Sequence, residues 1–238
     1  MKGPYGLELK DDCKACKNKE AGFFCHLGSA ALKEFDAIKS TAIYPKGALL
    51  FLEKQDSRGV FLLCEGEVKL SVSSREGKTL IMRIARAGEI LGLMATLAAT
   101  TYEVTAETIH PCQVAFIRKD EFQRYIENHP AVALNLVKQM SIQYQGACEQ
   151  LRTVGLSSSA HEKLARLLLA WSEGVQQTKD GTRIKLPLTH EEIAEFIGTT
   201  RETVTRTLSD FKVRHLVAMQ GATLTIPSRA ALETYANG

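Results

Sequence analysis

Seven apolar residues between Ala133 and Val154 recur at alternating intervals of four and three residues, and this spacing constrains the fold most strongly. A 3.5-residue period places them along one side of a long helix, over about three heptads. Pro130 opens that helix, and Gly155 with the serines after it ends it. The seam either packs on the rest of the chain or pairs with a second copy, and we favour pairing. The predicted dimer interface consists of Val137, Met140, Tyr144, Ala147, Leu151 and Val154.

Short β-rich runs alternate with glycine-containing turns in the segment before this helix. Many short strands at this spacing predict an all-β barrel or sandwich, preceded by a short helix over 29–40. The expected strands cover 48–52, 59–64, 67–72, 79–84, 102–109 and 113–117. We therefore predict an α+β chain of four parts. They are a cysteine-bearing segment (1–28), a jelly-roll β-barrel (29–129), a dimerisation helix (130–155) and a winged helix-turn-helix domain (156–238).

Two short helices joined by a glycine turn are predicted in the last part. Thr189 is a good N-cap, and Glu192 three residues later completes a capping box. Gly198 suits the left-handed position that ends a helix, and Thr199 or Thr200 can cap the next one. This arrangement is the helix-turn-helix signature. A strand over 183–188 and a hairpin near 223–227 supply the expected wing.

The second of these helices carries polar residues on its outward face, close to its start. Arginine bonds the O6 and N7 atoms of guanine in the major groove, and glutamate accepts from the N4 amine of cytosine. The alternative interpretation is a helical hairpin whose charged face is exposed to solvent and binds no ligand. From Leu156 onward there are ten Lys and Arg against nine Asp and Glu, so DNA affinity must come from charge placement. The predicted base-reading residues are Arg201, Glu202, Thr205 and Arg206, and the predicted phosphate contacts are Thr189, His190, Thr199 and Thr200.

The order of barrel, seam helix and helix-turn-helix, with the stretch Arg201-Glu202-Thr203-Val204-x-Arg206, resembles the cAMP receptor protein/FNR family of bacterial transcription regulators. The resemblance covers nearly the whole chain. It places Arg201, Glu202 and Arg206 at the base-reading positions of the cAMP-receptor branch. The FNR branch has an apolar residue at the first of these positions. The resemblance thus implies a homodimer on a palindrome of TGTGA-like half-sites, with RNA polymerase as a further partner. Thr205 departs from the glycine of the cAMP-receptor branch and leaves the flanking base open.

The family barrel holds cAMP with a glutamate on the ribose and an Arg-Ser pair on the phosphate. Alignment on Gly88–Gly92 puts Leu93 at the glutamate position, and alignment back from Cys112 puts Tyr102 and Glu103 at the Arg-Ser positions. A buried cyclic phosphate needs a cation and hydrogen-bond donors, which these residues do not supply. We therefore do not expect cAMP binding.

Three cysteines crowd into the first part of the chain, with Cys13 and Cys16 in a Cys-x-x-Cys spacing followed by Cys25. Thiolates are suitable ligands for zinc or for an iron–sulfur cluster. Alternatively, these cysteines form a thiol redox switch or have no functional role. In the FNR branch, three N-terminal cysteines and a fourth late in the barrel hold a [4Fe–4S] cluster that responds to oxygen. Cys112 falls at that fourth position. The resemblance therefore implies a cluster on Cys13, Cys16, Cys25 and Cys112.

The remaining composition excludes several classes of protein. No apolar run reaches the roughly 18 residues of a membrane span, and the first twelve residues lack a signal-peptide core, so we expect a cytoplasmic protein with no membrane contact. The Gly-x-Ser-x-Gly, P-loop and His-Glu-x-x-His patterns are missing from the sequence, and we expect no enzyme. A regulator with another effector or none is the alternative function. A ligand-binding module without DNA contact is more remote.

Overall fold

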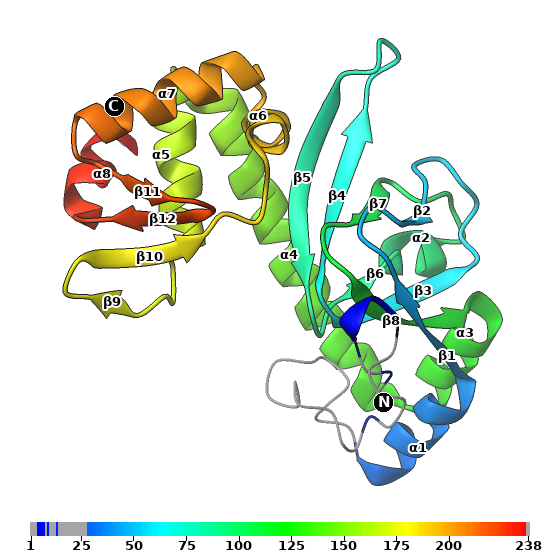
Figure 1. Ribbon diagram of the computed structural model, residues 1–238. Helices are drawn as coiled ribbons and strands as arrows, with labels where there is room; N and C mark the ends of the chain where they lie inside the picture. Colours follow the sequence, from blue (N-terminus) through cyan, green and yellow to red (C-terminus); the bar gives the residue numbers. More distant parts are fainter. Residues whose placement is uncertain (1–3, 8, 10–12, 14–27, 237–238) are drawn as a thin grey trace. The chain divides into compact units, whose positions relative to one another are not determined.

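The computed structural model describes residues 4–7, 9, 13 and 28–236. The chain divides into two compact units, one made of residues up to Glu76 with Met82–Gly146, the other of Gly77–Ile81 with the chain from Ala147 onward. Figure 1 follows the elements along the sequence. After a short 3-10 turn (Pro4–Gly6), they are α1 (Ser29–Ile38), β1 (Lys39–Tyr44), β2 (Leu49–Phe51), β3 (Gly59–Glu65), β4 (Glu67–Ser73), β5 (Thr79–Arg86), β6 (Ile90–Leu91), α2 (Leu93–Ala98), β7 (Thr105–Thr108), β8 (Cys112–Arg118), α3 (Lys119–Asn128) and α4 (Pro130–Leu156).

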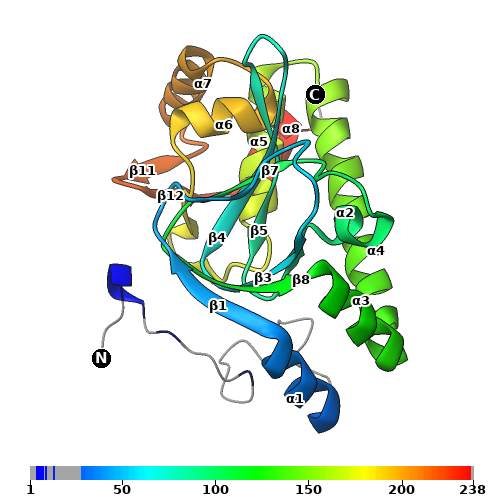
Figure 2. The same ribbon diagram turned by 90° about the vertical axis from the view of Figure 1, so that its right-hand side faces the viewer.

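Two antiparallel four-stranded sheets form the barrel of the first unit, in the orders β1-β8-β3-β6 and β2-β7-β4-β5. Strand β3 is buried on both faces, which explains its uninterrupted apolar run. Val60 and Leu62 join a core cluster with residues of α1 and α3, whereas Phe61 and Leu63 join a cluster with residues of the second sheet. The first sheet is therefore the middle layer, and Figure 2 shows α1 and α3 on its outer side. The predicted α+β fold is confirmed.

Strand β1 is the clearest difference from the sequence-based expectation. The apolar spacing from Ser29 predicted a helix as far as Ser40, but the helix ends at Ile38 and β1 begins at Lys39. Strand β1 pairs with β8 along its whole length, from Lys39 opposite Ile117 to its last residue. This long-range pairing overrides the local helical pattern. The expected strand over 102–109 is shortened to β7, and helices α2 and α3 were not predicted.

Helix α4 covers the predicted dimerisation helix and ends one residue later, at Leu156, so Gly155 lies inside its last turn. Val137, Tyr144 and Leu151 are 57%, 73% and 64% exposed, as an unpaired seam requires. Met140 instead packs against the core of its own unit, and Ala147 and Val154 are half-buried. The exposed apolar stripe of α4 is thus narrower than the predicted interface.

The elements of the second unit are α5 (Ala160–Trp171), β9 (Gln177–Thr178), β10 (Gly181–Lys185), α6 (His190–Ile197), α7 (Arg201–Val213), β11 (Ala218–Gln220), β12 (Thr223–Ile226) and α8 (Arg229–Ala236). Helices α6 and α7 form the helix-turn-helix, and the four strands form a small antiparallel sheet in the order β11-β12-β10-β9. The predicted strand over 183–188 begins earlier, at Gly181. Only glycine fits at this position, because φ is 112° and a Cβ atom would clash with the Ile226 carbonyl. Helix α8 was not predicted. Within the described part of the chain, no helix is long and apolar enough to cross a membrane.

Candidate nucleic-acid interface

The predicted capping box at the start of α6 is present. The hydroxyl of Thr189 accepts from the Glu192 backbone N–H at 3.2 Å. The Glu192 carboxylate accepts in return from the Thr189 N–H at 2.9 Å. Two backbone donors that a helix start leaves unsatisfied are therefore paired.

A left-handed glycine ends α6, as the sequence predicted. Gly198 has φ 65° and ψ 48°, and its N–H bonds the Ala194 carbonyl. A Cβ atom on Gly198 would lie 3.2 Å from the Val154 side chain on α4. Thr200 then caps α7 by accepting from the Thr203 N–H at 3.3 Å. The turn between the two helices is fixed by these local bonds.

Helix α7 buries one face and presents the other to solvent. Val204, Leu208 and Phe211 are at most 1% exposed. Arg201 and Arg206 are exposed, as is their neighbour Glu202, and within the described chain their side chains form no hydrogen bond or ion pair. Three charged groups at the capped end of a helix are therefore free to pair with an external partner.

His190 and Thr205 contact each other across the two helices. The His190 Nδ1 atom lies 3.0 Å from the Thr205 hydroxyl oxygen. The same hydroxyl donates to the Arg201 carbonyl, also at 3.0 Å. These two predicted DNA contacts thus form one unit, and residue spacing alone gave no sign of it.

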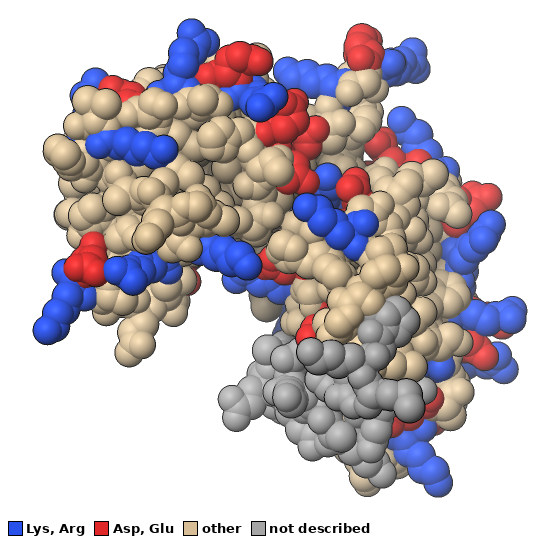
Figure 3. Space-filling model, viewed as in Figure 1, with Lys and Arg blue, Asp and Glu red and all other residues tan. Residues whose placement is uncertain are grey.

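The surface charge is mixed. Figure 3 shows Lys and Arg interspersed with Asp and Glu on the visible face. The net charge of the chain is only +3. Any affinity for a polyanion must come from the placement of individual cations, as the sequence indicated.

Gln150 on α4 anchors the end of α6 and is missing from the sequence-based site. Its side chain is buried, and its Nε2 amide donates to the Phe196 carbonyl at 2.6 Å and to the Ile81 carbonyl at 3.1 Å. The Phe196 carbonyl belongs to the last turn of α6, where helix carbonyls lack an internal partner. One amide group therefore satisfies two backbone acceptors beside the helix-turn-helix.

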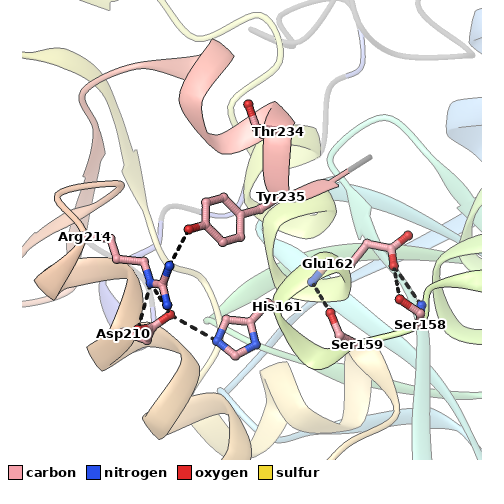
Figure 4. A pocket seen from close by; sticks show the side chains of 8 residues that line it. All are labelled: Ser158, Ser159, His161, Glu162, Asp210, Arg214, Thr234 and Tyr235. Atoms are coloured by element: carbon pink, nitrogen blue, oxygen red, sulfur yellow. Dashed lines mark hydrogen bonds and ion pairs between the residues drawn. The ribbon is translucent and has the colours of Figure 1, made fainter. Parts of the chain in front are cut away.

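A polar pocket of about 480 Å³ lies between α5, α7 and α8 (Figure 4). Asp210 accepts from Arg214 at 2.9 Å, lies 3.2 Å from the His161 ring and has a lowered pKa because of the Arg214 guanidinium. Arg214 also donates to the Tyr235 hydroxyl at 2.8 Å. These groups pair with one another, so the cluster joins the far end of α7 to its neighbours rather than offering charges to a ligand.

The helix-turn-helix is matched by the Crp-like helix-turn-helix domain over residues 162–235, and the barrel by the cyclic nucleotide-binding domain over residues 42–129. The transcriptional activatory protein AadR of Rhodopseudomonas palustris is 28% identical over 81% of this chain and 80% of its own. The nitrogen fixation regulation protein FixK of Bradyrhizobium diazoefficiens is 26% identical over 91% of each chain. A CooA variant from Carboxydothermus hydrogenoformans superposes with a TM-score of 0.74 at 25% identity, over 87% of this chain and 90% of that one.

The chain belongs to the Crp/FNR family. It is a DNA-binding transcription regulator of the Crp/FNR type, and its relatives are regulators rather than enzymes.

The interior of the barrel is filled at the two positions where the sequence placed the family's cAMP contacts. Tyr102, at the expected phosphate-binding position, is 2% exposed and stacks on Phe51 with ring centroids 4.1 Å apart. Its hydroxyl donates to the Gly59 carbonyl at 2.7 Å and accepts from the Arg58 N–H at 3.2 Å. Leu93, at the expected ribose position, is 2% exposed. Aromatic and aliphatic side chains of the protein itself therefore occupy both positions.

The two described cysteines of the predicted cluster lie apart. The Cys13 thiol accepts from Lys39 Nζ at 3.1 Å, and burial raises its pKa to about 12. Lys39 pairs with Ile117 near the end of β8 that is far from Cys112, and Cys112 itself is fully buried in the cluster between the two sheets. Cys112 is five residues from Ile117 along β8, about 17 Å at the rise of a strand, and on its opposite face.

Thiolates that share one cluster must all lie within a few ångströms of it, so this arrangement does not fit a [4Fe–4S] cluster bound by both Cys13 and Cys112. Burial raises the pKa of the Cys112 thiol, which donates to the Glu67 and His110 carbonyls. Cys16 and Cys25 lie outside the described residues. Among the residues that are described, no group of three or more metal-ligating side chains is found.

Proposed function

We propose that this protein is a homodimeric regulator that binds a palindrome of two TGTGA-like half-sites about one helical turn apart. The observation that supports this most is the outward face of α7. Arg201, Glu202 and Arg206 are exposed at its capped start and have no partner in the described chain. Two arginines suit guanine and one glutamate suits cytosine, as the two strands of TGTGA require.

The dimer part of the proposal is supported by the exposed seam of α4. Val137, Tyr144 and Leu151 recur every seven residues, and Leu134 and Ile142 beside them are 60% and 69% exposed. A monomer rarely leaves so many large apolar side chains on one helix in water. RNA polymerase is the proposed further partner, by analogy with the family.

Control of the regulator is a separate proposal. Oxygen or redox control through an N-terminal [4Fe–4S] cluster follows from the cysteine spacing, and the separation of Cys13 from Cys112 argues against the full predicted ligand set. Zinc, a thiol switch, another small ligand or no effector are the alternatives. Iron and sulfide assays on anaerobically purified protein separate the cluster from these alternatives. Close to four irons per chain that are lost in air support the cluster, and a colourless protein that still binds DNA refutes it.

The DNA-binding proposal is tested by sedimentation and electrophoretic mobility together. We expect a dimeric mass, and one shifted band with a palindromic duplex whose half-sites lie about one helical turn apart. A duplex with one half-site scrambled should bind far more weakly, because the second subunit loses its base contacts. A monomeric mass both with and without DNA, or equal binding of the two duplexes, would refute the proposal.

A further inference from the structure

Thr205 stands on the outward face of α7, one turn after Arg201, and is exposed. It departs from the glycine that the cAMP-receptor branch of the family carries there. Serine and threonine share a hydroxyl, and threonine adds a methyl group. The question is which of these two groups of Thr205 is available to DNA.

The hydroxyl of Thr205 is engaged inside the protein. Its one hydrogen goes to the Arg201 carbonyl at 3.0 Å, because a carbonyl oxygen only accepts. The His190 Nδ1 atom, 3.0 Å away, must then carry the hydrogen of the second bond and donate it to the Thr205 oxygen. The hydroxyl therefore has no donor left for a base edge.

The methyl group is the part of Thr205 that no hydrogen bond engages. In the major groove, the one apolar group on a base edge is the 5-methyl of thymine, and threonine methyls contact it. A hydroxyl that is held on both sides also fixes the rotamer, so the methyl direction is set before DNA binds.

We propose that Thr205 selects thymine, through methyl–methyl contact, at the base pair that it faces in each half-site. His190 is a positioning residue in this proposal: it holds the Thr205 hydroxyl away from the base. The inference rests on the proposed function, since it presupposes that α7 lies in the major groove. It adds a base preference that Arg201, Glu202 and Arg206 do not supply.

The test begins with a selection from duplexes in which TGTGA is fixed and the neighbouring positions are random. Each thymine of the selected site is then replaced singly by deoxyuridine, which removes only the 5-methyl group. Affinities are measured by fluorescence anisotropy. For the wild type we expect one position per half-site where deoxyuridine weakens binding about fourfold, the value of one buried methyl-sized group.

Two variants separate the methyl from the hydroxyl. Thr205→Ser keeps the bonds to Arg201 and His190 but lacks the methyl, and it should bind the thymine and deoxyuridine duplexes equally. Thr205→Val keeps a methyl and lacks the hydroxyl, and it should retain a preference for thymine. Circular dichroism checks that both variants are folded, which an exposed position favours.

Three results would overturn the inference while leaving the proposed function intact. They are a wild type that binds specifically but ignores every deoxyuridine, a Thr205→Ser variant that keeps the penalty, and a Thr205→Val variant that loses it. A wild type that selects no sequence at all refutes the proposed function, and the inference with it.

Discussion

Replacement of Tyr102 tests whether the barrel interior is held by its own side chains. The Tyr102 hydroxyl pairs the Arg58 N–H and the Gly59 carbonyl. Tyr102→Phe removes this hydroxyl and leaves a backbone donor unpaired, which costs about 1–2 kcal/mol. Tyr102→Ala also removes the ring that stacks on Phe51 and opens a cavity, and such truncations cost about 3–5 kcal/mol. The two variants should therefore differ by at least about 1 kcal/mol.

Urea unfolding with two probes measures this difference. Far-ultraviolet circular dichroism follows the whole chain, and the fluorescence of Trp171, the one tryptophan, follows the second unit. We expect Tyr102→Ala to move the barrel transition by about 2 M urea and to leave the Trp171 transition in place. Equal stabilities of the two variants would contradict the stacking argument. If the Trp171 transition shifted as far as the barrel transition, the result would contradict the assignment of Tyr102 to the barrel alone.

Four further outcomes follow from local contacts. Thr189→Ala should destabilise the second unit by about 1 kcal/mol in thermal unfolding through loss of the capping box, whereas Thr189→Ser should not. Gln150→Glu should weaken DNA binding and stability near neutral pH and recover both as the pH falls, since a protonated carboxyl regains a donor for the Phe196 carbonyl. The pKa of Asp210 is lowered, so its carboxylate stabilises the folded protein above about pH 4 and this stabilisation is lost in acid. The difference in unfolding free energy between wild type and Asp210→Asn should therefore disappear at acid pH. Calorimetry should detect no cAMP binding, because Tyr102 and nearby apolar groups fill the site.

The helix-turn-helix could be predicted from the sequence because its signals are local. The capping box of Thr189, the left-handed Gly198 and the Thr200 cap each act within a few residues, and all three are confirmed. Features that depend on distant partners could not be predicted. Strand β1 is fixed by β8, whose paired residues are 68 to 78 positions away, and the local pattern favoured a helix at the start of β1.

The same limit applies to the site. Periodicity placed Met140 and Val137 on one seam, but it cannot tell a residue that packs on its own core from one that stays exposed. The bond between His190 and Thr205 joins residues fifteen apart and belongs to no repeating pattern. The position of Cys112 was matched by family resemblance, which carries no information on where Cys13 lies.

Base selectivity at Arg201 tests the central claim most directly. Anisotropy titrations at physiological salt compare the TGTGA palindrome with one in which a single guanine per half-site is replaced by adenine, for wild type and Arg201→Ala. A bidentate arginine–guanine contact carries about 1–3 kcal/mol of discrimination. At one guanine position we expect the wild type to lose that much per half-site, and Arg201→Ala to bind both duplexes alike while its fold is unchanged. A wild type that binds both duplexes and scrambled DNA equally would contradict the assignment of α7 as the recognition helix.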